Sequence, residues 1–403
     1  MNVKKLILTI SVAVFCLFNT AAGERWSKEK AWEWYNNQNW IRGYNGYPSN
    51  CVNRIAMWQE YKHKEVFDQI ETEFQLAKET GFNAVRAIVQ FEVWYYEHDS
   101  FMNNLEEYLT LADKYGLQVM LTLGNDCTVP KSRWKPVEFG EQPVDWGYHS
   151  GTKTGPHTGD YSETGYCLLD DPEFEPYYYK MVDELAKKYA KDSRIHIWNV
   201  WNEVGNSNRG SKSMEALEKF FSILRSYDPI QPLTADCWRY KEGLPYTEIE
   251  KRACELSDVI TFHYYGSYEN MVQIIEQLRK EYDRPLINSE WLHRIRGNNV
   301  TEIFPLFYLE KIGSYHWGLI AGYSQTYEPA GTYYIRYLQD DCHNLDMSKW
   351  QHDIYRFNGL PYDPQEIKTI KRFSKMADER FIKEQEENKQ IQKAKSLKKK
   401  NKK

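Results

Sequence analysis

Short apolar segments alternate with amphipathic segments along most of the 403-residue chain, and this alternation restricts the fold more than any other feature. We expect the apolar segments to form strands, and the segments with apolar residues three or four positions apart to form helices. The predicted strands are 40–45, 83–90, 116–123, 195–201, 232–237, 259–264, 285–289 and 314–321. The predicted helices are 65–80, 103–115, 172–191, 213–225, 248–256, 271–282, 301–312 and 364–375.

Seven of the eight predicted strands follow a helix, an order that is typical of α/β proteins with a parallel sheet. Eight such units predict a (β/α)8 TIM barrel built as a single domain. An open doubly wound sheet is the competing fold, and it should carry a glycine-rich phosphate turn after its first strand. No G-x-G-x-x-G or G-x-x-x-x-G-K-[ST] motif occurs in the sequence, which therefore favours the barrel.

Two connections between predicted elements are too long to be simple turns. One covers 125–171, after the third strand, and the other covers 322–360, after the eighth strand. Loops of this length without regular structure are usually either functional or disordered. Both are dense in aromatic residues, which argues against disorder, and the loops that follow strands build the functional face of a barrel. We therefore expect both loops to border the functional site.

The net charge of -5 combines two regions of opposite sign. Residues 24–382 carry 41 basic and 54 acidic side chains, a net -13, whereas 383–403 carry nine Lys and three Glu, a net +6. An acidic body argues against nucleic acid as the ligand. The lysine-rich end is typical of a frayed helix that continues into a disordered tail. We therefore predict a barrel domain over 24–382 and a disordered basic tail over 383–403.

The first 23 residues have the composition of a secretory signal peptide. Lys4 and Lys5 precede an apolar run over 6–18, and small residues follow at 20–23. This run is short for a membrane core of roughly 30 Å, and no other segment is a plausible span. We therefore expect cleavage after 1–23, and a secreted or periplasmic protein without a membrane span. We also expect a monomer.

Six cysteines remain after the predicted cleavage. They are Cys51, Cys127, Cys167, Cys237, Cys254 and Cys342. An exported protein can form disulfides, but this wide spacing lacks the density of a disulfide-built scaffold. No C-x-x-C pair, H-E-x-x-H motif or tight His/Cys/Asp cluster is present. We expect most of the cysteines to be buried free thiols, and we expect no metal and no other cofactor.

Two glutamates directly follow apolar strands. Glu203 comes after the fourth predicted strand, and Glu290 comes after the seventh. Because barrel strands end at one face, and these two strands are about half a barrel apart, the two carboxylates should face each other. Such a pair can cleave a glycosidic bond, with one carboxyl group as proton donor and the other as nucleophile or as base for water. A single glutamate at a strand end would indicate little, because most glutamates are ordinary surface residues. Two glutamates at equivalent strand ends indicate a functional pair.

The strand ends resemble those of the clan A glycoside hydrolases, especially the cellulase-like enzymes of glycoside hydrolase family 5. The motif WNE over 201–203 is similar to the clan's fourth-strand Asn-Glu, and NSEW over 288–291 is similar to its seventh-strand end. Further matches are Arg86 on the second strand, His263 and Tyr265 as an H-x-Y motif on the sixth, and Trp317 on the eighth. The resemblance covers about residues 40–360. The family's strand-three histidine has no counterpart in LGND over 123–126, and the first strand is similar only loosely.

This resemblance implies catalytic roles for the two glutamates. Glu203 is expected to be the acid/base and Glu290 the nucleophile. Glu203 must carry a proton when the substrate arrives, so we expect an apolar wall such as Trp201 or Trp317 to raise its pKa.

The resemblance also implies substrate-binding and supporting residues. Arg86 should keep the nucleophile ionised, and Tyr265 should hydrogen bond to the nucleophile. Asn202 should donate to the sugar 2-hydroxyl, a bond that strengthens in the transition state. Trp317 should form the floor of a sugar subsite, and His263 is either a sugar contact or a packed core histidine.

Together these expectations describe a secreted retaining β-glycoside hydrolase with one catalytic barrel domain. Its expected partner is a carbohydrate, a polysaccharide or oligosaccharide with β-linkages like those of cellulose, xylan or mannan. Double displacement would require carboxyl groups about 5–5.5 Å apart. No G-x-S-x-G motif is present, which removes a common hydrolase alternative. The remaining alternatives are a transglycosylase with the same site and a catalytically inactive barrel that binds glycans.

Overall fold

The computed structural model describes residues 23–156, 162–239 and 246–400. The predicted signal peptide over 1–23 therefore lies outside the described residues except for its last position, and its cleavage stays a prediction. A search of the described helices finds none that is both long and apolar enough to cross a membrane.

Eight parallel strands form the centre of the molecule. They are β1 (Arg42–Asn45), β2 (Ala84–Ile88), β3 (Gln118–Asn125), β4 (Ile195–Asn202), β5 (Leu233–Ala235), β6 (Ile260–His263), β7 (Leu286–Trp291) and β8 (Gly313–Trp317). Their order in the sheet is β5-β4-β3-β2-β1-β8-β7-β6. A parallel bridge between Cys237 and Phe262 connects the β5 and β6 edges. The predicted (β/α)8 barrel is therefore confirmed.

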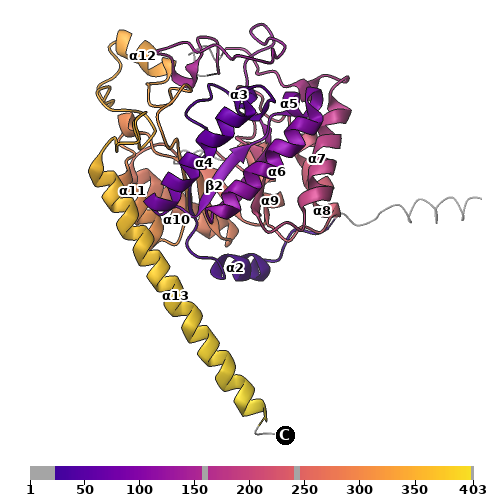
Figure 1. Cartoon of the computed structure of the whole chain (residues 1–403), viewed down its shortest axis with the longest axis vertical. Helices are drawn as coiled ribbons and strands as arrows, with labels where there is room; N and C mark the ends of the chain where they lie inside the picture. Colours follow the sequence, from indigo (N-terminus) through magenta and orange to yellow (C-terminus); the bar gives the residue numbers. More distant parts are fainter. Residues whose placement is uncertain (1–22, 157–161, 240–245, 401–403) are drawn as a thin grey trace, which may run out of the picture.

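Helices surround the barrel between successive strands (Figure 1). The described helices are α2 (Lys28–Asn36), α3 (Arg54–Trp58), α4 (His63–Thr80), α5 (Phe91–Tyr96), α6 (His98–Lys114), α7 (Glu175–Tyr189), α8 (Met214–Ser226), α9 (Glu248–Leu256), α10 (Tyr268–Tyr282), α11 (Val300–Leu309), α12 (Gly331–Leu338) and α13 (Pro364–Lys400). Short 3-10 turns occur at His149–Gly151, Leu168–Asp170 and Arg294–Arg296.

Local sequence explains where several of these helices begin and end. Thr247 accepts a hydrogen bond from the Glu250 N–H, and the Glu250 carboxylate accepts one from the Thr247 N–H, which is a capping box at the start of α9. Gly81 ends α4 with a φ of 107°, a left-handed conformation that glycine adopts without strain. Gly81 thus sets the short connection from α4 to β2 at the amino ends of the strands.

Helix α2 closes one end of the barrel. A layer of buried side chains, each on a strand or directly before one, fills the interior: Ile41, Ala84, Met120, Ile197, Val259, Ile287 and Tyr315. Tyr35 of α2 packs on this layer, and its hydroxyl donates to the Lys311 carbonyl at 2.8 Å. In Figure 1, α2 lies at the end of the molecule opposite α12. The face at the carboxyl ends of the strands is thus the end available for a site.

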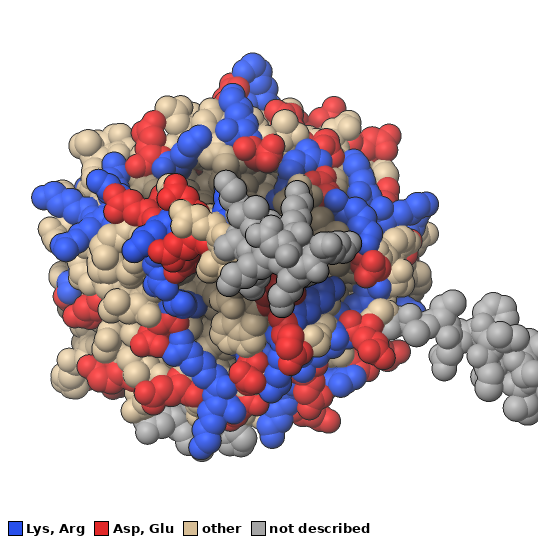
Figure 2. Space-filling view, turned by 90° about the horizontal axis from the view of Figure 1, so that it is seen from below, with Lys and Arg blue, Asp and Glu red and all other residues tan. Residues whose placement is uncertain are grey.

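Charged side chains of both signs are interspersed on the face at the α2 end (Figure 2). Among the described residues drawn there, no continuous area of one sign is visible.

The helices differ from the prediction in two ways. Helices α2, α3, α5 and α12 were not among the predicted elements, and α12 gives the loop over 322–360 a regular part. Helix α13 continues to Lys400 instead of ending near 375, so the segment predicted as a disordered tail is helical through that residue. Ion pairs four residues apart, Arg380–Glu384 and Lys383–Glu387, support a helix in this lysine- and glutamate-rich segment. The domain boundaries themselves stay predictions.

All six described cysteines are free. Cys51, Cys167, Cys237 and Cys254 are buried, whereas Cys127 and Cys342 are partly exposed. The Sγ atoms of Cys237 and Cys254 lie 3.0 Å apart. The prediction of buried free thiols is therefore confirmed for most of them.

Candidate active site

A cavity of about 1250 Å³ lies at the carboxyl ends of the strands, where a barrel usually carries its active site. Both long loops border this cavity, as predicted, through residues such as His149 and Tyr333. All seven site residues that the sequence predicts line it: Arg86, Asn202, Glu203, His263, Tyr265, Glu290 and Trp317.

The two long loops hold each other in place over the cavity. The Gly147 N–H donates to Gln325 Oε1 at 2.6 Å, and Gln325 Nε2 donates to the Asp145 carbonyl at 2.9 Å. Several of their aromatic side chains, such as Trp146 and Tyr323, are exposed and do not line the cavity. The dense aromatic content of the loops therefore reflects their outer surface as much as the site.

Glu290 lies in β7, one residue before its end, and its side chain is buried. Arg86 Nη1 donates to Glu290 Oε1 at 2.8 Å, and the Tyr265 hydroxyl donates to Oε2 at 2.6 Å. The predicted arginine and tyrosine partners of Glu290 are thus both in contact with it. Each oxygen of this carboxylate has one strong donor.

Glu203 directly follows β4 and has a φ of 48°. A non-glycine residue in this left-handed region is strained, and such strain is often found at functional sites. His263 Nδ1 donates to Glu203 Oε1 at 2.8 Å. The Cys127 thiol donates to Oε2 at 2.7 Å, and Asn206 Nδ2 donates to the same oxygen. The sharp turn after β4 thus directs the carboxylate to these three donors.

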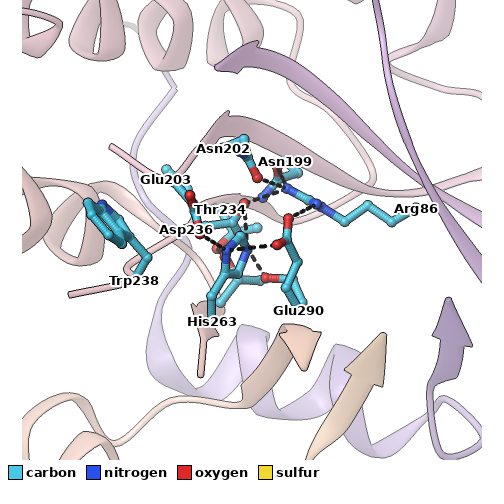
Figure 3. Close-up of polar contacts among 12 residues, drawn as sticks. Arg86, Asn199, Asn202, Glu203, Thr234, Asp236, Trp238, His263 and Glu290 are labelled. Carbon is cyan, nitrogen blue, oxygen red and sulfur yellow. Dashed lines mark hydrogen bonds and ion pairs between the residues drawn. The ribbon is translucent and has the colours of Figure 1, made fainter. Parts of the chain in front are cut away.

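Arg86 is the centre of the polar network in Figure 3. Besides Glu290, its guanidinium donates to the side chains of Asn45, Asn199, Asn202 and Asp236, at 2.7, 3.2, 2.6 and 2.8 Å. The guanidinium is fully buried, and two carboxylates within hydrogen-bonding distance balance its charge. Five partners on four strands or strand ends therefore fix this single side chain.

His263 is the second positive charge of the site. Its Nδ1 lies 2.8 Å from a Glu203 oxygen and 3.5 Å from a Glu290 oxygen, and its Nε2 lies 3.5 Å from an Asp236 oxygen. Burial opposes the charge, but these three carboxylates outweigh burial and raise the pKa of His263 to about 10. The histidine is therefore protonated at neutral pH, and it contacts both catalytic candidates rather than only packing in the core.

The pKa values of the two glutamates shift in the directions opposite to the expected roles. Burial raises the pKa of Glu203, but His263, Cys127 and Asn206 more than reverse this effect, so its pKa lies below the ordinary value. The pKa of Glu290 is raised by burial and by the charge of Glu203, against the effects of His263 and Arg86. The prediction that an apolar wall raises the pKa of Glu203 is therefore wrong. Polar donors surround this carboxylate instead.

Of the two tryptophans expected to form that wall, only Trp317 lines the cavity. Trp201 is fully buried and packs on Phe220 of α8, with ring centres 5.1 Å apart, on the outer side of the barrel. Trp317 lines the cavity on the side of His352, with ring centres 6.3 Å apart. Trp317 and Glu203 line the same cavity, and the sugar-floor role of Trp317 stays a prediction.

Asn202 is placed beside both glutamates, but its amide is already engaged. Its Oδ1 accepts from Arg86, and its Nδ2 donates to Asn125 Oδ1 at 2.9 Å. The same nitrogen also lies 3.5 Å from Cys127 Sγ, so both of its hydrogens have partners and a sugar hydroxyl would have to replace one of them.

Several residues of this network were not predicted from the sequence. They are Asn45, Asn125, Cys127, Asn199, Asn206, Asp236 and Ser289. A signal existed for Asp236, because it directly follows the apolar strand β5 just as Glu203 follows β4. No sequence signal marks Cys127, whose contact with Glu203 depends on how the loop after β3 turns.

One group of described residues has the spacing of metal ligands: Glu203, His263 and Glu290, with one atom of each within 4.8 Å of the others. Arg86 and the protonated His263 already balance two of the three buried carboxylates nearby. A cation at this position would therefore lie beside two positive charges, which opposes its binding.

Comparison with known proteins agrees with this geometry. Residues 29–302 match the family described as Cellulase (glycosyl hydrolase family 5). A search among curated proteins gave no match. The residues matched by the family include β1 to β7 and thus both glutamates.

Solved structures with the same fold are distant in sequence. An endo-beta-1,4-mannanase from Thermotoga petrophila is 16% identical, with a TM-score of 0.53, covering 85% of this chain and 78% of that chain. An exo-beta-1,4-mannosidase from Opitutaceae bacterium strain TAV5 is 15% identical, with a TM-score of 0.51, covering 85% and 60%. A beta-galactosidase from the psychrophilic Marinomonas ef1 is 11% identical, with a TM-score of 0.52, covering 83% and 59%.

The family match extends over more than half of the chain and includes the strand ends that carry both carboxylates. The chain therefore belongs to glycosyl hydrolase family 5 and is a glycoside hydrolase that acts on O-glycosyl compounds.

Proposed function

We propose that this protein is an exported retaining β-glycosidase that cleaves a β-linked polysaccharide or oligosaccharide. The observation that carries the proposal is the short distance between the catalytic carboxylates. One oxygen of Glu203 and one of Glu290 lie within 4.8 Å of each other. Inverting enzymes need carboxyl groups about 6.5–9.5 Å apart to accommodate a water molecule, whereas retaining enzymes use about 5–5.5 Å.

In the first step, Glu290 attacks the anomeric carbon while the bond to the leaving oxygen breaks. Arg86 and Tyr265 hold one oxygen each, so the carboxylate has a defined orientation. The leaving oxygen takes a proton from Glu203. In the second step, Glu203 removes a proton from water, the water oxygen bonds to the anomeric carbon, and Glu290 is released.

The proton for the first step can come from the His263–Glu203 pair. His263 is protonated at neutral pH because burial is outweighed by three carboxylates, which raise its pKa to about 10. Its Nδ1 lies 2.8 Å from Glu203 Oε1, so a proton can move along this hydrogen bond. Glu203 then acts as acid although its own pKa is lowered. The charge of Glu290 decreases as it forms the covalent intermediate, which favours this transfer.

A β-1,4-mannan is the first substrate to test. The endo-mannanase and the exo-mannosidase described above both have this fold and are named for β-1,4-linked mannose substrates. Glucan, xylan and β-galactoside substrates belong in the same panel, because the beta-galactosidase shares the fold as well.

The experiment is a screen of purified polysaccharides, oligosaccharides and aryl glycosides, with product analysis and NMR detection of the first anomer released. We expect a β product to appear first. Glu290→Gln should reduce hydrolysis by at least about 10⁴-fold, as for other enzymes that lose their nucleophile. Gln is the matched change, since it keeps the shape of the side chain.

Other outcomes would contradict the proposal. An α anomer as first product would show inversion and remove Glu290 as nucleophile. Sugar binding without turnover by the wild-type protein would indicate a glycan-binding barrel. Products longer than the substrate, with little hydrolysis, would indicate a transglycosylase.

A further inference from the structure

A free thiol touches the proposed acid/base. Cys127 lies in the loop just after β3, and its Sγ atom is 2.7 Å from Glu203 Oε2. The sulfur also accepts hydrogen bonds from Asn206 Nδ2 at 3.2 Å and from Asn202 Nδ2 at 3.5 Å. Since a thiol has one hydrogen and two amide groups already point at the sulfur, that hydrogen is directed to the carboxylate.

Backbone contacts of the loop fix the position of this thiol. The Cys127 N–H donates to Asn125 Oδ1 at 3.0 Å, and Asn125 Nδ2 donates back to the Cys127 carbonyl at 3.1 Å. The next N–H, of Thr128, donates to Ser207 Oγ at 3.0 Å. The loop after β3 is thus attached to the loop after β4, which carries Glu203, and the thiol cannot move independently of it.

The thiol remains a donor over a wide pH range. Burial and the negative charge of Glu203 raise the pKa of Cys127 well above its ordinary value. It is therefore protonated at neutral pH and is a poor nucleophile. This chemistry agrees with a hydrogen-bonding role and excludes the thiolate as a second nucleophile of the site.

The two oxygens of Glu203 have different partners. Cys127 and Asn206 both donate to Oε2, whereas His263 alone, of the residues that the structure describes, donates to Oε1. We propose that Cys127 is a positioning residue that holds Oε2 and thereby leaves Oε1 as the oxygen that gives and takes the proton. This inference rests on the proposed acid/base role of Glu203.

The first test compares Cys127→Ala and Cys127→Ser by their pH profiles of kcat/KM on a substrate of the wild-type enzyme. Ala removes a donor that favours ionised Glu203, so the pKa of Glu203 rises. Because Glu203 must be protonated as acid, activity should persist to higher pH, with the alkaline limb shifted up by about half to one pH unit, the size expected for one hydrogen bond. Ser keeps a donor and should shift this limb less.

Cys342→Ser is the matched control, because Cys342 is the other cysteine that is partly exposed and free. It should keep the wild-type profile. Thermal unfolding of each variant checks that it is folded. If the alanine variant is folded and loses activity with both limbs unchanged, Cys127 only fills space and the inference is wrong.

A second test does not depend on hydrolysis. A thiol reagent, methyl methanethiosulfonate, is applied at pH 8, and labelling of Cys127 relative to Cys342 is followed by peptide mass spectrometry. Glu203→Gln removes the negative charge that keeps the thiol protonated, so Cys127 should be labelled several-fold faster than in the wild type. Equal labelling rates of Cys127 in the wild type and in Glu203→Gln would show that the thiol does not contact the Glu203 carboxylate.

The two tests separate the failure of this inference from the failure of the proposed function. If the wild type hydrolyses no glycan but the labelling rate still changes in Glu203→Gln, the thiol–carboxylate contact stands and the proposed function is wrong. If the wild type is active and neither the profile nor the labelling rate changes, the proposed function stands and the role of Cys127 is wrong.

Discussion

The ends of β4 and β7 each carry a buried glutamate, yet the two carboxylates have different kinds of partners. Glu290 is bound by Arg86, which is always charged, and by Tyr265, whose pKa is raised well above its ordinary value by burial and by Glu290 itself. Glu203 is bound by His263, which can release a proton, and by Cys127. Both carboxylates lie near a positive charge, but only Glu203 has a hydrogen-bond partner, the imidazolium of His263, that can pass a proton to it.

This difference matches the two chemical tasks. A nucleophile needs a fixed charge and a fixed orientation, and partners that do not titrate provide both. An acid/base must change its protonation in each half of the reaction, and a neighbouring histidine can supply and accept the proton. We therefore predict that substitutions around Glu290 shift the acid limb of the pH profile of kcat/KM. Substitutions around Glu203 should shift its alkaline limb.

Arg86→Met should have the largest effect, because it removes the fixed charge on the β7 side. It leaves Glu290 and Asp236 buried without their cation, which costs about 3–5 kcal/mol of stability, measurable by urea unfolding. The pKa of Glu290 should rise further, so the acid limb of kcat/KM should move to higher pH. Arg42→Met is the matched control, since Arg42 is also buried and ion-paired but does not line the cavity. Arg42→Met should lower the free energy of unfolding without shifting the acid limb of kcat/KM.

His263→Asn should remove the proton exchange on the β4 side and reduce activity by about 10²–10⁴-fold, the usual contribution of general acid–base catalysis. It should also change how stability depends on pH. The carboxylates of Glu203, Asp236 and Glu290 raise the pKa of His263 from 6.5 to about 10. A raised folded-state pKa stabilises the fold fully below pH 6.5, and this contribution is lost as pH rises through about 10.

The free energy of unfolding, measured at several pH values between 6 and 10, should therefore decrease more in the wild type than in His263→Asn. His196→Asn is the control. Burial lowers the pKa of His196 to about 3, so this histidine is neutral throughout that range and its replacement should leave the pH dependence unchanged. Parallel curves for the wild type and His263→Asn would show that His263 carries no charge in the folded protein.

Tyr265→Phe should have the smallest effect of the three, because Arg86 still holds Glu290. Loss of one hydrogen bond to a charged group should lower kcat/KM by about 10- to 100-fold. The acid limb should move up slightly, since the lost donor favoured ionised Glu290. Tyr44→Phe serves as control, because the buried Tyr44 hydroxyl has no partner among the described residues. A shift of the alkaline limb instead would mean that Tyr265 acts on Glu203.

The sequence predicts the candidate site to different extents on the two sides. On the β7 side, Glu290, Arg86 and Tyr265 are all predicted, and the structure brings them together. On the β4 side, Glu203 and His263 are predicted, but Cys127, Asn206 and the sign of the pKa shift of Glu203 are not. Arg86 lies on β2 and Tyr265 lies two residues after β6, so both positions follow from the barrel. Cys127 and Asn206 lie in loops, whose paths do not follow from a repeating pattern.

By itself, the sequence determined the barrel and the residue at the end of each strand. Apolar runs and helical spacing are local properties, and eight repeats of them leave few ways to bury the strands. Only the tertiary structure decided which charges meet. Arg86 and Glu290 are 204 positions apart in the chain, and their 2.8 Å contact exists only when β2 and β7 belong to the same closed sheet. Desolvation and Coulomb energies depend on such distances, so the protonation of the site is a property of the folded barrel.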